Sequence, residues 1–207
     1  MSRKFVYITG LHGDEPIPVI ALAVIGSEQL VGNPKALSVG KRFINNDLNK
    51  SFGIDKSGYE FKRAKEILKL IPKKAIIIDF HTCSAVSPPF VIVVDKKMLS
   101  FARKTGLKHV VFMKYIINNG HSLINYRKGI SIEVGQHKRY DSFQTMLKVI
   151  KNLQLNKIVE QKIYEVYDKI TISGGYSNFK KYRDNFYRVL AGENAYNFYG
   201  LKAKKII

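Results

Sequence analysis

The sequence is poor in cysteine, in long hydrophobic runs and in acidic residues. Cysteine occurs once in the 207 residues, at Cys83, which excludes an internal disulfide framework and is typical of a reducing cytoplasm. No apolar run approaches the roughly 20 residues that a membrane-spanning helix needs. The first four residues, MSRK, precede only a strand-length apolar run, with no signal-peptide pattern. We therefore expect a cytoplasmic protein without membrane contacts.

The shortage of acidic residues leaves a strong positive charge. Sixteen acidic residues face 35 basic ones, so the net charge is +19, and the pI is near 9.9. Such a charge attracts nucleic acids, but the lysines are spread along the whole chain and form no basic run or tail. We therefore do not expect nucleic acid as a partner and expect an anionic small-molecule substrate. The oligomeric state is not indicated.

The chain contains 45% hydrophobic residues, which suffice for a core. Strand-like and helix-like apolar patterns alternate along it and predict an α/β fold with a mixed central sheet flanked by helices. Strands are expected at 5–9, 75–80, 90–94, 109–113 and 130–134. Helices are expected at 16–27, 58–71, 96–105 and 141–155, the last with Asp141 as N-cap. After residue 155 the pattern becomes short strands at 162–172, 186–190 and 198–207. We predict a main domain over 1–155 and a small β subdomain over 156–207.

The most informative motif is GLHGDE, residues 10–15, which follows the first expected strand. His12 and Glu15, three residues apart on a glycine-containing turn, can point at one metal ion. Imidazole nitrogen and carboxylate oxygen suit zinc, with a third protein ligand and water completing a catalytic site. The alternative is a glutamate that caps the next helix beside a loop histidine.

A third ligand candidate stands in DFHTC, residues 79–83, at the end of the second expected strand. Open α/β sheets present functional groups at the carboxyl ends of their strands, which favours His81 as the ligand. Asp79 either orients a ligand histidine through its free ring nitrogen or makes a loop hydrogen bond. Cys83 is expected to be a small buried loop residue.

Glu133 lies inside the apolar segment ISIEVG. An ionised glutamate is costly to bury there without partners, whereas beside a metal-activated water it is a general base. The alternative is an edge-strand acid that faces solvent. Arg42 can stabilise the oxyanion formed in amide hydrolysis, a contribution of about 3–4 kcal/mol. Asn49 and Lys50 can hold a substrate carboxylate, although a solvated surface position is the common place for a lysine.

Taken in order, five motifs carry a family resemblance: GLHGDE, NPKAL, Arg42 with DLNKSF, DFHT and IEVG. Together they resemble the succinylglutamate desuccinylase/aspartoacylase family, which has a zinc carboxypeptidase-like fold. The segment YRVLAGENAY, residues 187–196, resembles the C-terminal end of aspartoacylases. The motifs extend over nearly the whole chain.

The resemblance implies a role for each matched position. It implies one zinc ion per chain, bound by His12, Glu15 and His81. It implies Glu133 as the base that activates water, and Arg42 as the group that polarises the scissile carbonyl. The residues that bind substrate are then Asn49, Lys50 and Tyr196.

The chain departs from the family at substrate-binding positions. Lys50 stands where the family has arginine, so the bidentate fork for carboxylate is lost. No arginine aligns cleanly with the substrate-binding arginine ahead of IEVG. His121 is the nearest match by position and Arg127 by chemistry, and both are candidates for binding substrate. The C-terminal domain is also short, with little room for loops that shape an acyl pocket.

The sequence thus predicts a zinc-dependent hydrolase that cleaves an N-acyl amino acid or a similar small carboxylated amide. One alternative is a zinc carboxypeptidase that acts on peptides. Another is a basic nucleic-acid-binding or ribosome-binding protein that retains the fold.

Overall fold

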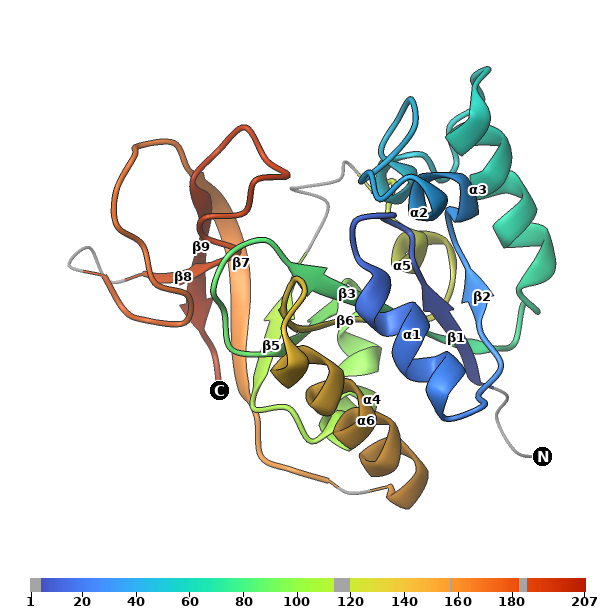
Figure 1. The fold of residues 1–207 in the computed structure, drawn as a ribbon. Helices are drawn as coiled ribbons and strands as arrows, with labels where there is room; N and C mark the ends of the chain where they lie inside the picture. The colour runs from blue at the N-terminus through green and yellow to red at the C-terminus, as the bar shows by residue number, and fades with distance from the viewer. Residues whose placement is uncertain (1–4, 114–119, 157, 183–185) are drawn as a thin grey trace.

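A computed structural model describes residues 5–113, 120–156, 158–182 and 186–207. Within these residues the chain forms one mixed sheet in the strand order β2-β1-β3-β6-β4-β5-β7-β9-β8 (Figure 1). The strands are β1 Phe5–Thr9, β2 Leu30–Val31, β3 Ile76–Cys83, β4 Phe90–Val93, β5 His109–Phe112, β6 Gly129–Gln136, β7 Lys162–Ile170, β8 Tyr187–Val189 and β9 Gly200–Lys205. The helices are α1 Pro16–Val24, α2 Pro34–Ser38, α3 Tyr59–Leu70, α4 Leu99–Ala102, α5 Leu123–Tyr126 and α6 Tyr140–Leu155, with 3-10 helices η1 Leu48–Lys50, η2 Lys96–Met98 and η3 Arg103–Thr105. The predicted α/β fold with a mixed sheet is confirmed.

The central strand β3 is buried along its whole length. Ile78 and Phe80 belong to one hydrophobic core with residues of α1 and α6, which lie in front of the sheet in Figure 1. Ile77 belongs to a second core with residues of α3 and α5 on the other face. Because side chains alternate along a strand, Asp79 and His81 continue the face of Ile77. The strand thus presents two polar side chains on one face.

Strand direction reverses between β6 and β4, and again on each side of β9. β1, β3 and β6 are parallel to one another, while β4 pairs antiparallel with β6. The register between β3 and β6 pairs Asp79 with Ser131 and His81 with Glu133. Paired residues project to the same side of a sheet. Four polar side chains therefore meet on one face at the carboxyl ends of these two strands.

The C-terminal strands continue the same sheet, because β7 pairs parallel with β5. A third core packs against them, with Phe90, Tyr164 and Phe179 among its members. The centre of the Phe179 ring lies 5.2 Å from that of Phe90 and 5.1 Å from that of Tyr164. The predicted division into units at 1–155 and 156–207 stays a prediction.

Helix ends and short elements differ from the sequence predictions. Helix α6 begins at Tyr140 and its N-cap is Arg139, so Asp141 as N-cap is wrong. Asp141 lies in the first turn, where its charge still favours the helix. The helix expected over 96–105 is η2, α4 and η3 in succession, ended by Gly106 in the left-handed conformation. The sequence did not predict β2, α2 and α5, because these elements are too short to show a periodic pattern of apolar residues.

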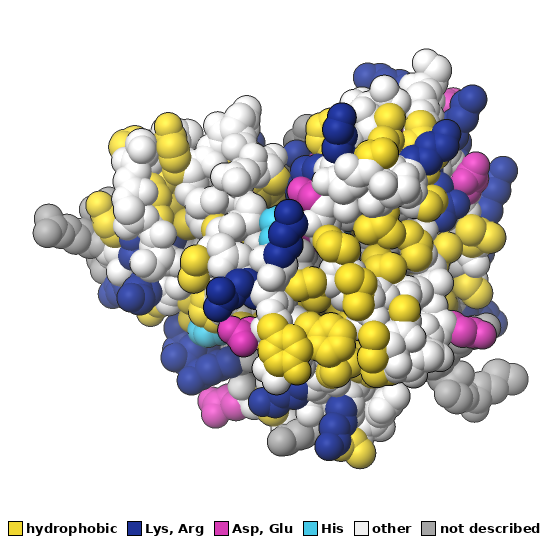
Figure 2. All heavy atoms as spheres, viewed as in Figure 1, with side chains coloured by type: hydrophobic (Ala, Val, Ile, Leu, Met, Phe, Trp, Pro, Cys, Tyr) yellow, Lys and Arg dark blue, Asp and Glu magenta, His cyan; other side chains and the backbone are white. Residues whose placement is uncertain are grey.

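The surface has one apolar region and scattered basic residues. Figure 2 shows hydrophobic side chains gathered over α1 and α6, where Ile20, Val24 and Tyr140 are exposed. On this face the Lys and Arg side chains are distributed around the region and form no continuous stripe. No helix of the described residues is long and apolar enough to cross a membrane.

Candidate metal and catalytic site

The loop between β1 and α1 carries the first two metal-type side chains. A Cβ at Gly13 would come within 2.0 Å of the Ala36 backbone, so only glycine allows this close approach. The Gly13 N–H donates to the Arg42 carbonyl at 3.2 Å. Glu15 takes the N-cap position of α1, but its side chain makes no capping hydrogen bond. The helix-capping alternative is therefore wrong.

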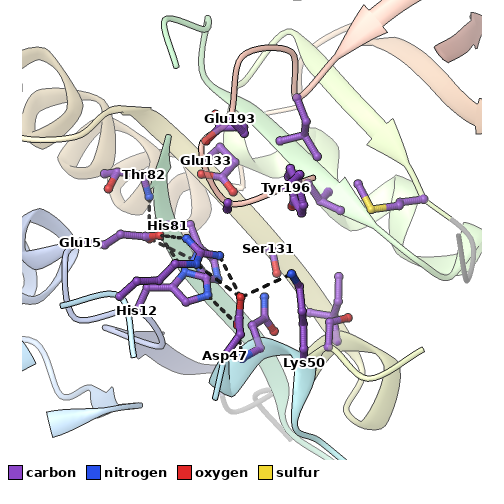
Figure 3. A pocket seen from close by; sticks show the side chains of 18 of the residues that line it. His12, Glu15, Asp47, Lys50, His81, Thr82, Ser131, Glu133, Glu193 and Tyr196 are labelled. Carbon is purple, nitrogen blue, oxygen red and sulfur yellow. Dashed lines mark hydrogen bonds and ion pairs between the residues drawn. The ribbon is translucent and has the colours of Figure 1, made fainter. Parts of the chain in front are cut away.

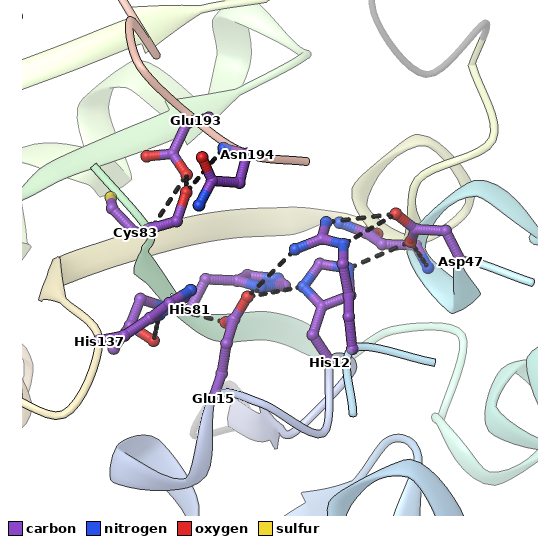
Figure 4. A network of polar contacts seen from close by, with 12 residues as sticks. His12, Glu15, Asp47, His81, Cys83, His137, Glu193 and Asn194 are labelled. Atoms are coloured by element: carbon purple, nitrogen blue, oxygen red, sulfur yellow. Dashed lines mark hydrogen bonds and ion pairs between the residues drawn. The ribbon is translucent and has the colours of Figure 1, made fainter. Parts of the chain in front are cut away.

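The Glu15 carboxylate lies between two histidine rings instead (Figure 4). Its Oε1 is 2.7 Å from His12 Nδ1 and its Oε2 is 3.1 Å from His81 Nδ1. One ligand atom from each of these buried residues lies within 4.8 Å of the others. Two imidazole nitrogens and a carboxylate oxygen form the donor set of a three-ligand zinc site. The residues from the two motifs therefore meet in a group that can hold a metal ion.

Each histidine is held from behind by an aspartate. His12 Nε2 lies 3.1 Å from Asp47 Oδ1, and His81 Nε2 lies 2.8 Å from Asp79 Oδ2. These contacts turn both Nδ1 atoms toward Glu15 and orient both rings, as carboxylates behind metal-binding histidines do. Two roles were considered for Asp79, orienting a ligand histidine or making a loop hydrogen bond. The structure shows Asp79 in contact with His81, which corresponds to the first role.

The electrostatics of this group favour positive charge. Burial lowers the pKa of His81, but Asp79 and Glu15 outweigh burial and raise it well above its usual value. Burial raises the pKa of Glu15, but His12 and His81 bring it well below its usual value. Carboxylates that stabilise protons on the imidazoles would equally stabilise a metal cation between them.

Glu133 lies beside the histidine group on β6. That strand runs between β3 and β4, so the solvent-facing edge-strand alternative is wrong. Burial, together with the charges of Glu15 and Glu193, raises the pKa of Glu133 to about 7, although His81 acts in the opposite direction. The Cys83 thiol donates to Glu133 Oε2 at 3.4 Å. Cys83 is buried as expected, but it is the last residue of β3 and touches this carboxylate.

Arg42 is anchored to the same group by two carboxylates. Its Nη2 lies 3.2 Å from Asp47 Oδ2 and its Nη1 lies 3.7 Å from Glu15 Oε1. The segment between Arg42 and Asp47 is held by the fully buried Glu60. The Glu60 carboxylate accepts the N–H groups of residues 44–46 at 2.8–3.4 Å. A buried acceptor on α3 thus sets the path of this loop.

These side chains line a cavity of about 60 Å³ that also contains three predicted substrate residues (Figure 3). Asn49 contributes from η1 and accepts the Leu123 N–H at 3.1 Å. Lys50 Nζ lies 5.4 Å from the centre of the Tyr196 ring. Burial raises the pKa of the Tyr196 hydroxyl, so this group is a neutral hydrogen-bond donor.

Two other candidates lie away from the cavity. His121 Nδ1 contacts the Phe52 carbonyl at 2.8 Å. The Arg127 guanidinium donates to the carbonyls of Tyr126 and Leu68. Neither residue is among those that line the cavity. The structure therefore does not bring His121 or Arg127 to the predicted substrate site, because backbone carbonyls occupy both side chains.

Sequence reasoning missed two carboxylates of the cavity, Asp47 and Glu193. Glu193 follows β8, and its Oε2 accepts the Ser84 N–H at 3.0 Å and the Ser84 hydroxyl at 2.6 Å. These bonds join the C-terminal segment to the end of β3. Both acids stand in motifs used for the resemblance, two or three residues before a predicted substrate residue, and this proximity was the available signal.

Comparison with known proteins gives a family match over part of the chain. Residues 29–155 match the succinylglutamate desuccinylase/aspartoacylase catalytic domain. This range includes Arg42, His81 and Glu133, whereas His12 and Glu15 precede it.

Curated relatives are distant in sequence. A probable aspartoacylase of Prochlorococcus marinus subsp. pastoris is 26% identical over 191 residues, which cover 78% of this chain and 65% of that protein. A probable aspartoacylase of Nostoc sp. is 37% identical over 67 residues, or 27% of this chain and 23% of that protein. The first three curated relatives are matched over only 43–65% of their own length.

Solved structures share the fold. Murine aminoacylase 3 superposes with a TM-score of 0.77 at 19% identity, covering 99% of this chain and 95% of that one. Succinylglutamate desuccinylase from Chromobacterium violaceum has a TM-score of 0.76 at 14% identity, covering 100% and 85%. Since the catalytic-domain match alone spans more than half of the residues, this chain belongs to the succinylglutamate desuccinylase/aspartoacylase family.

Proposed function

We propose that this protein is a zinc-dependent hydrolase that cleaves the amide bond of an N-acyl amino acid or a similar small carboxylated amide. Its family consists of zinc deacylases, and the buried group of His12, Glu15 and His81 fits the family's zinc site. The observation that carries the proposal is the meeting of this group with Glu133 and Arg42 in one cavity.

One zinc ion per chain would be held by Nδ1 of His12, Nδ1 of His81 and the Glu15 carboxylate. Bound zinc supplies a Lewis acid that lowers the pKa of water and polarises a carbonyl. Asp47 and Asp79 keep the two histidine rings in the orientation that binding needs. Three protein ligands leave a position for water or substrate.

Glu133 acts as the general base in this proposal. Its carboxylate faces the same side of the sheet as His81, and its pKa of about 7 suits proton exchange near neutral pH. Glu133 takes a proton from the attacking water and returns it to the leaving amine. The Cys83 thiol donates to one oxygen of the carboxylate and helps to orient it.

Arg42 stabilises the negative charge that develops on the carbonyl oxygen. Its guanidinium is preorganised by Asp47 and Glu15, so little reorganisation is needed during the reaction. Asn49, Lys50 and Tyr196 bind the substrate. The Lys50 side chain is 40% exposed, which suits attraction of a substrate carboxylate from solvent.

Side chains from η1, β3, β4, β6 and the segment after β8 enclose the cavity, and this favours small amides over peptides. A carboxypeptidase needs a groove that also accepts residues preceding the scissile bond. The buried ligand group likewise has no use in a nucleic-acid-binding protein.

The proposal is tested by metal analysis followed by an amine-release assay. Purified protein is expected to contain one zinc per chain and to hydrolyse members of a panel of N-acyl amino acids faster than peptides with free C-termini. Arg42→Ala is expected to lose about two to three orders of magnitude in kcat/KM, whereas Arg139→Ala, on the exposed end of α6, serves as the matched control. Absence of zinc, or full activity of Arg42→Ala, contradicts the proposal.

A further inference from the structure

The side chains that line the cavity are of two chemical kinds. One group contains the metal-type ligands, Glu133 and Arg42. The other group, called here the apolar wall, consists of Ile92, Val94, Met113, Ile124 and Leu190. Strand β4, the residues that directly follow β4, β5 and β8, and helix α5 thus contribute aliphatic or thioether side chains to the cavity.

The wall follows from the alternation along β4. Val91 and Val93 are buried in the core shared with α1 and α6. Ile92 therefore projects to the opposite face, and Val94, just beyond the strand, lines the same cavity. Ile92 pairs with Ser131 of β6, two residues from Glu133. The apolar wall consequently begins directly beside the proposed reaction centre.

Positive charge in the cavity is limited. Among the described residues that line it, Arg42 and Lys50 are the lysine and arginine side chains. Arg42 is already engaged by Asp47 and Glu15, and Lys50 Nζ lies 3.7 Å from Asp47. These two cations can therefore bind one substrate carboxylate in addition to the protein carboxylates. Lys50, at the more exposed position, would make the main contact.

Among the described residues that line the cavity, no further lysine or arginine can pair with a second substrate carboxylate. The remaining lining consists of the apolar wall, neutral polar side chains such as Asn49 and Ser122, and the carboxylate of Glu193. Arg127, the residue closest in chemistry to a carboxylate-binding arginine, contacts backbone carbonyls outside the cavity. An ionised group placed against the wall would lose hydration without compensation.

We propose, on the basis of the proposed hydrolase function, that the substrate carries a single carboxylate and an apolar substituent that packs against the wall. Its class is an N-acyl amino acid in which either the amino-acid side chain or the acyl chain is apolar. Dicarboxylates, including N-acyl derivatives of aspartate and glutamate, are poor substrates.

Two isosteric pairs test this on the zinc-loaded wild-type protein. N-acetyl-leucine is compared with N-acetyl-aspartate, and N-(4-methylpentanoyl)glycine with N-succinylglycine. One of the two pairs will be hydrolysed faster than the other. Within that pair, kcat/KM of the apolar member is expected to be at least tenfold higher than kcat/KM of the anionic member. Equal or faster turnover of the anionic member overturns the substrate inference while leaving the hydrolase function intact. No turnover of any of the four contradicts the hydrolase function as well.

A charge placed on the wall provides a second test. Val94→Arg is expected to shift the ratio of kcat/KM values toward the anionic member at least tenfold. Val86→Arg is the matched control, because Val86 is 79% exposed and is not part of the cavity lining. An unchanged ratio in a folded, zinc-loaded Val94→Arg variant overturns the inference. If that variant does not fold, the isostere comparison on the wild-type protein decides.

Discussion

At the β1–β3–β6 end of the sheet, charged side chains are buried and hold one another, whereas at the β7–β9–β8 end the interior is largely aromatic and aliphatic. The first end contains Glu15, Glu60 and Asp79, each less than 3% exposed. At the second end, basic side chains lie over aromatic rings, as Arg188 does over Tyr182 at 4.8 Å.

The two ends therefore have different requirements. A buried charge needs every partner in place. Removing one partner leaves an uncompensated charge in the interior, which lowers the stability more than the loss of an apolar contact does. When a packed ring is truncated, the free energy of unfolding falls with the number of atoms removed and the cavity they leave. The cavity nevertheless draws on both ends, since the segment after β8 contributes Glu193 and Tyr196 (Figure 3). We expect substitutions at the first end to change chemistry and metal binding, and substitutions at the second to change stability.

The largest effect is expected for Glu133→Gln. It removes the general base without changing its shape, so kcat should fall about 10²–10⁴-fold. Zinc content and the melting temperature should stay close to wild type. Glu66→Gln, on the exposed side of α3, is the control, and kcat within a few-fold of wild type for Glu133→Gln would remove Glu133 from the mechanism.

At the aromatic end, Phe179→Ala should lower the free energy of unfolding by about 3–5 kcal/mol. Phe179 is 9% exposed and its ring contacts Phe90, His109 and Tyr164. Denaturant unfolding measures the loss, and a chelator competition assay should find unchanged zinc affinity. A change in zinc affinity with little loss of stability would reverse the comparison between the two ends.

Glu60→Gln should destabilise the protein by about 1–3 kcal/mol. One amide oxygen cannot replace two carboxylate oxygens that accept three backbone N–H groups and the Asn33 amide. Because this residue sets the loop that carries Arg42 and Asp47, kcat/KM should fall as well. Unfolding curves and kinetics of Glu60→Gln and Glu66→Gln, compared side by side, separate a buried acceptor from an exposed one.

The smallest effect is expected for Asp79→Asn. The substitution keeps the size of the side chain but weakens its hold on His81, so zinc affinity should fall about 10–100-fold. Competition with a chelator measures this change, with the exposed Asp55→Asn as control. If Asp79→Asn binds zinc with wild-type affinity, Asp79 does not help to position His81 for metal binding and its role is confined to the structure of β3.

The residues predicted as metal ligands stand where strand ends can be recognised locally. His12 and Glu15 follow β1 within six residues, and His81 lies on β3, whose apolar run is visible in the sequence. Their meeting follows from the parallel pairing of β1 with β3. The contact of Asp79 with His81 joins residues two positions apart. Such features depend on strand alternation, which a single sequence carries.

Partners that are distant along the chain could not be predicted in this way. Asp47 contacts His12 across 35 residues, and Glu193 contacts Ser84 across 109. Arg127 was a candidate for substrate binding because its charge was visible, whereas its carbonyl acceptor, Leu68, lies 59 residues away. No local pattern records which acceptor a long side chain will reach.

Local pattern alone thus accounts for the α/β class, the His-Glu-His set and the glutamate at position 133 inside an apolar strand, because alternation and strand ends are properties of neighbouring residues. Three-dimensional packing accounts for the aspartates behind the histidines, the loop held by Glu60 and the apolar wall beside Glu133. These arise where segments far apart in the chain come together, and their energies depend on burial, distance and dielectric surroundings that exist only in the folded protein.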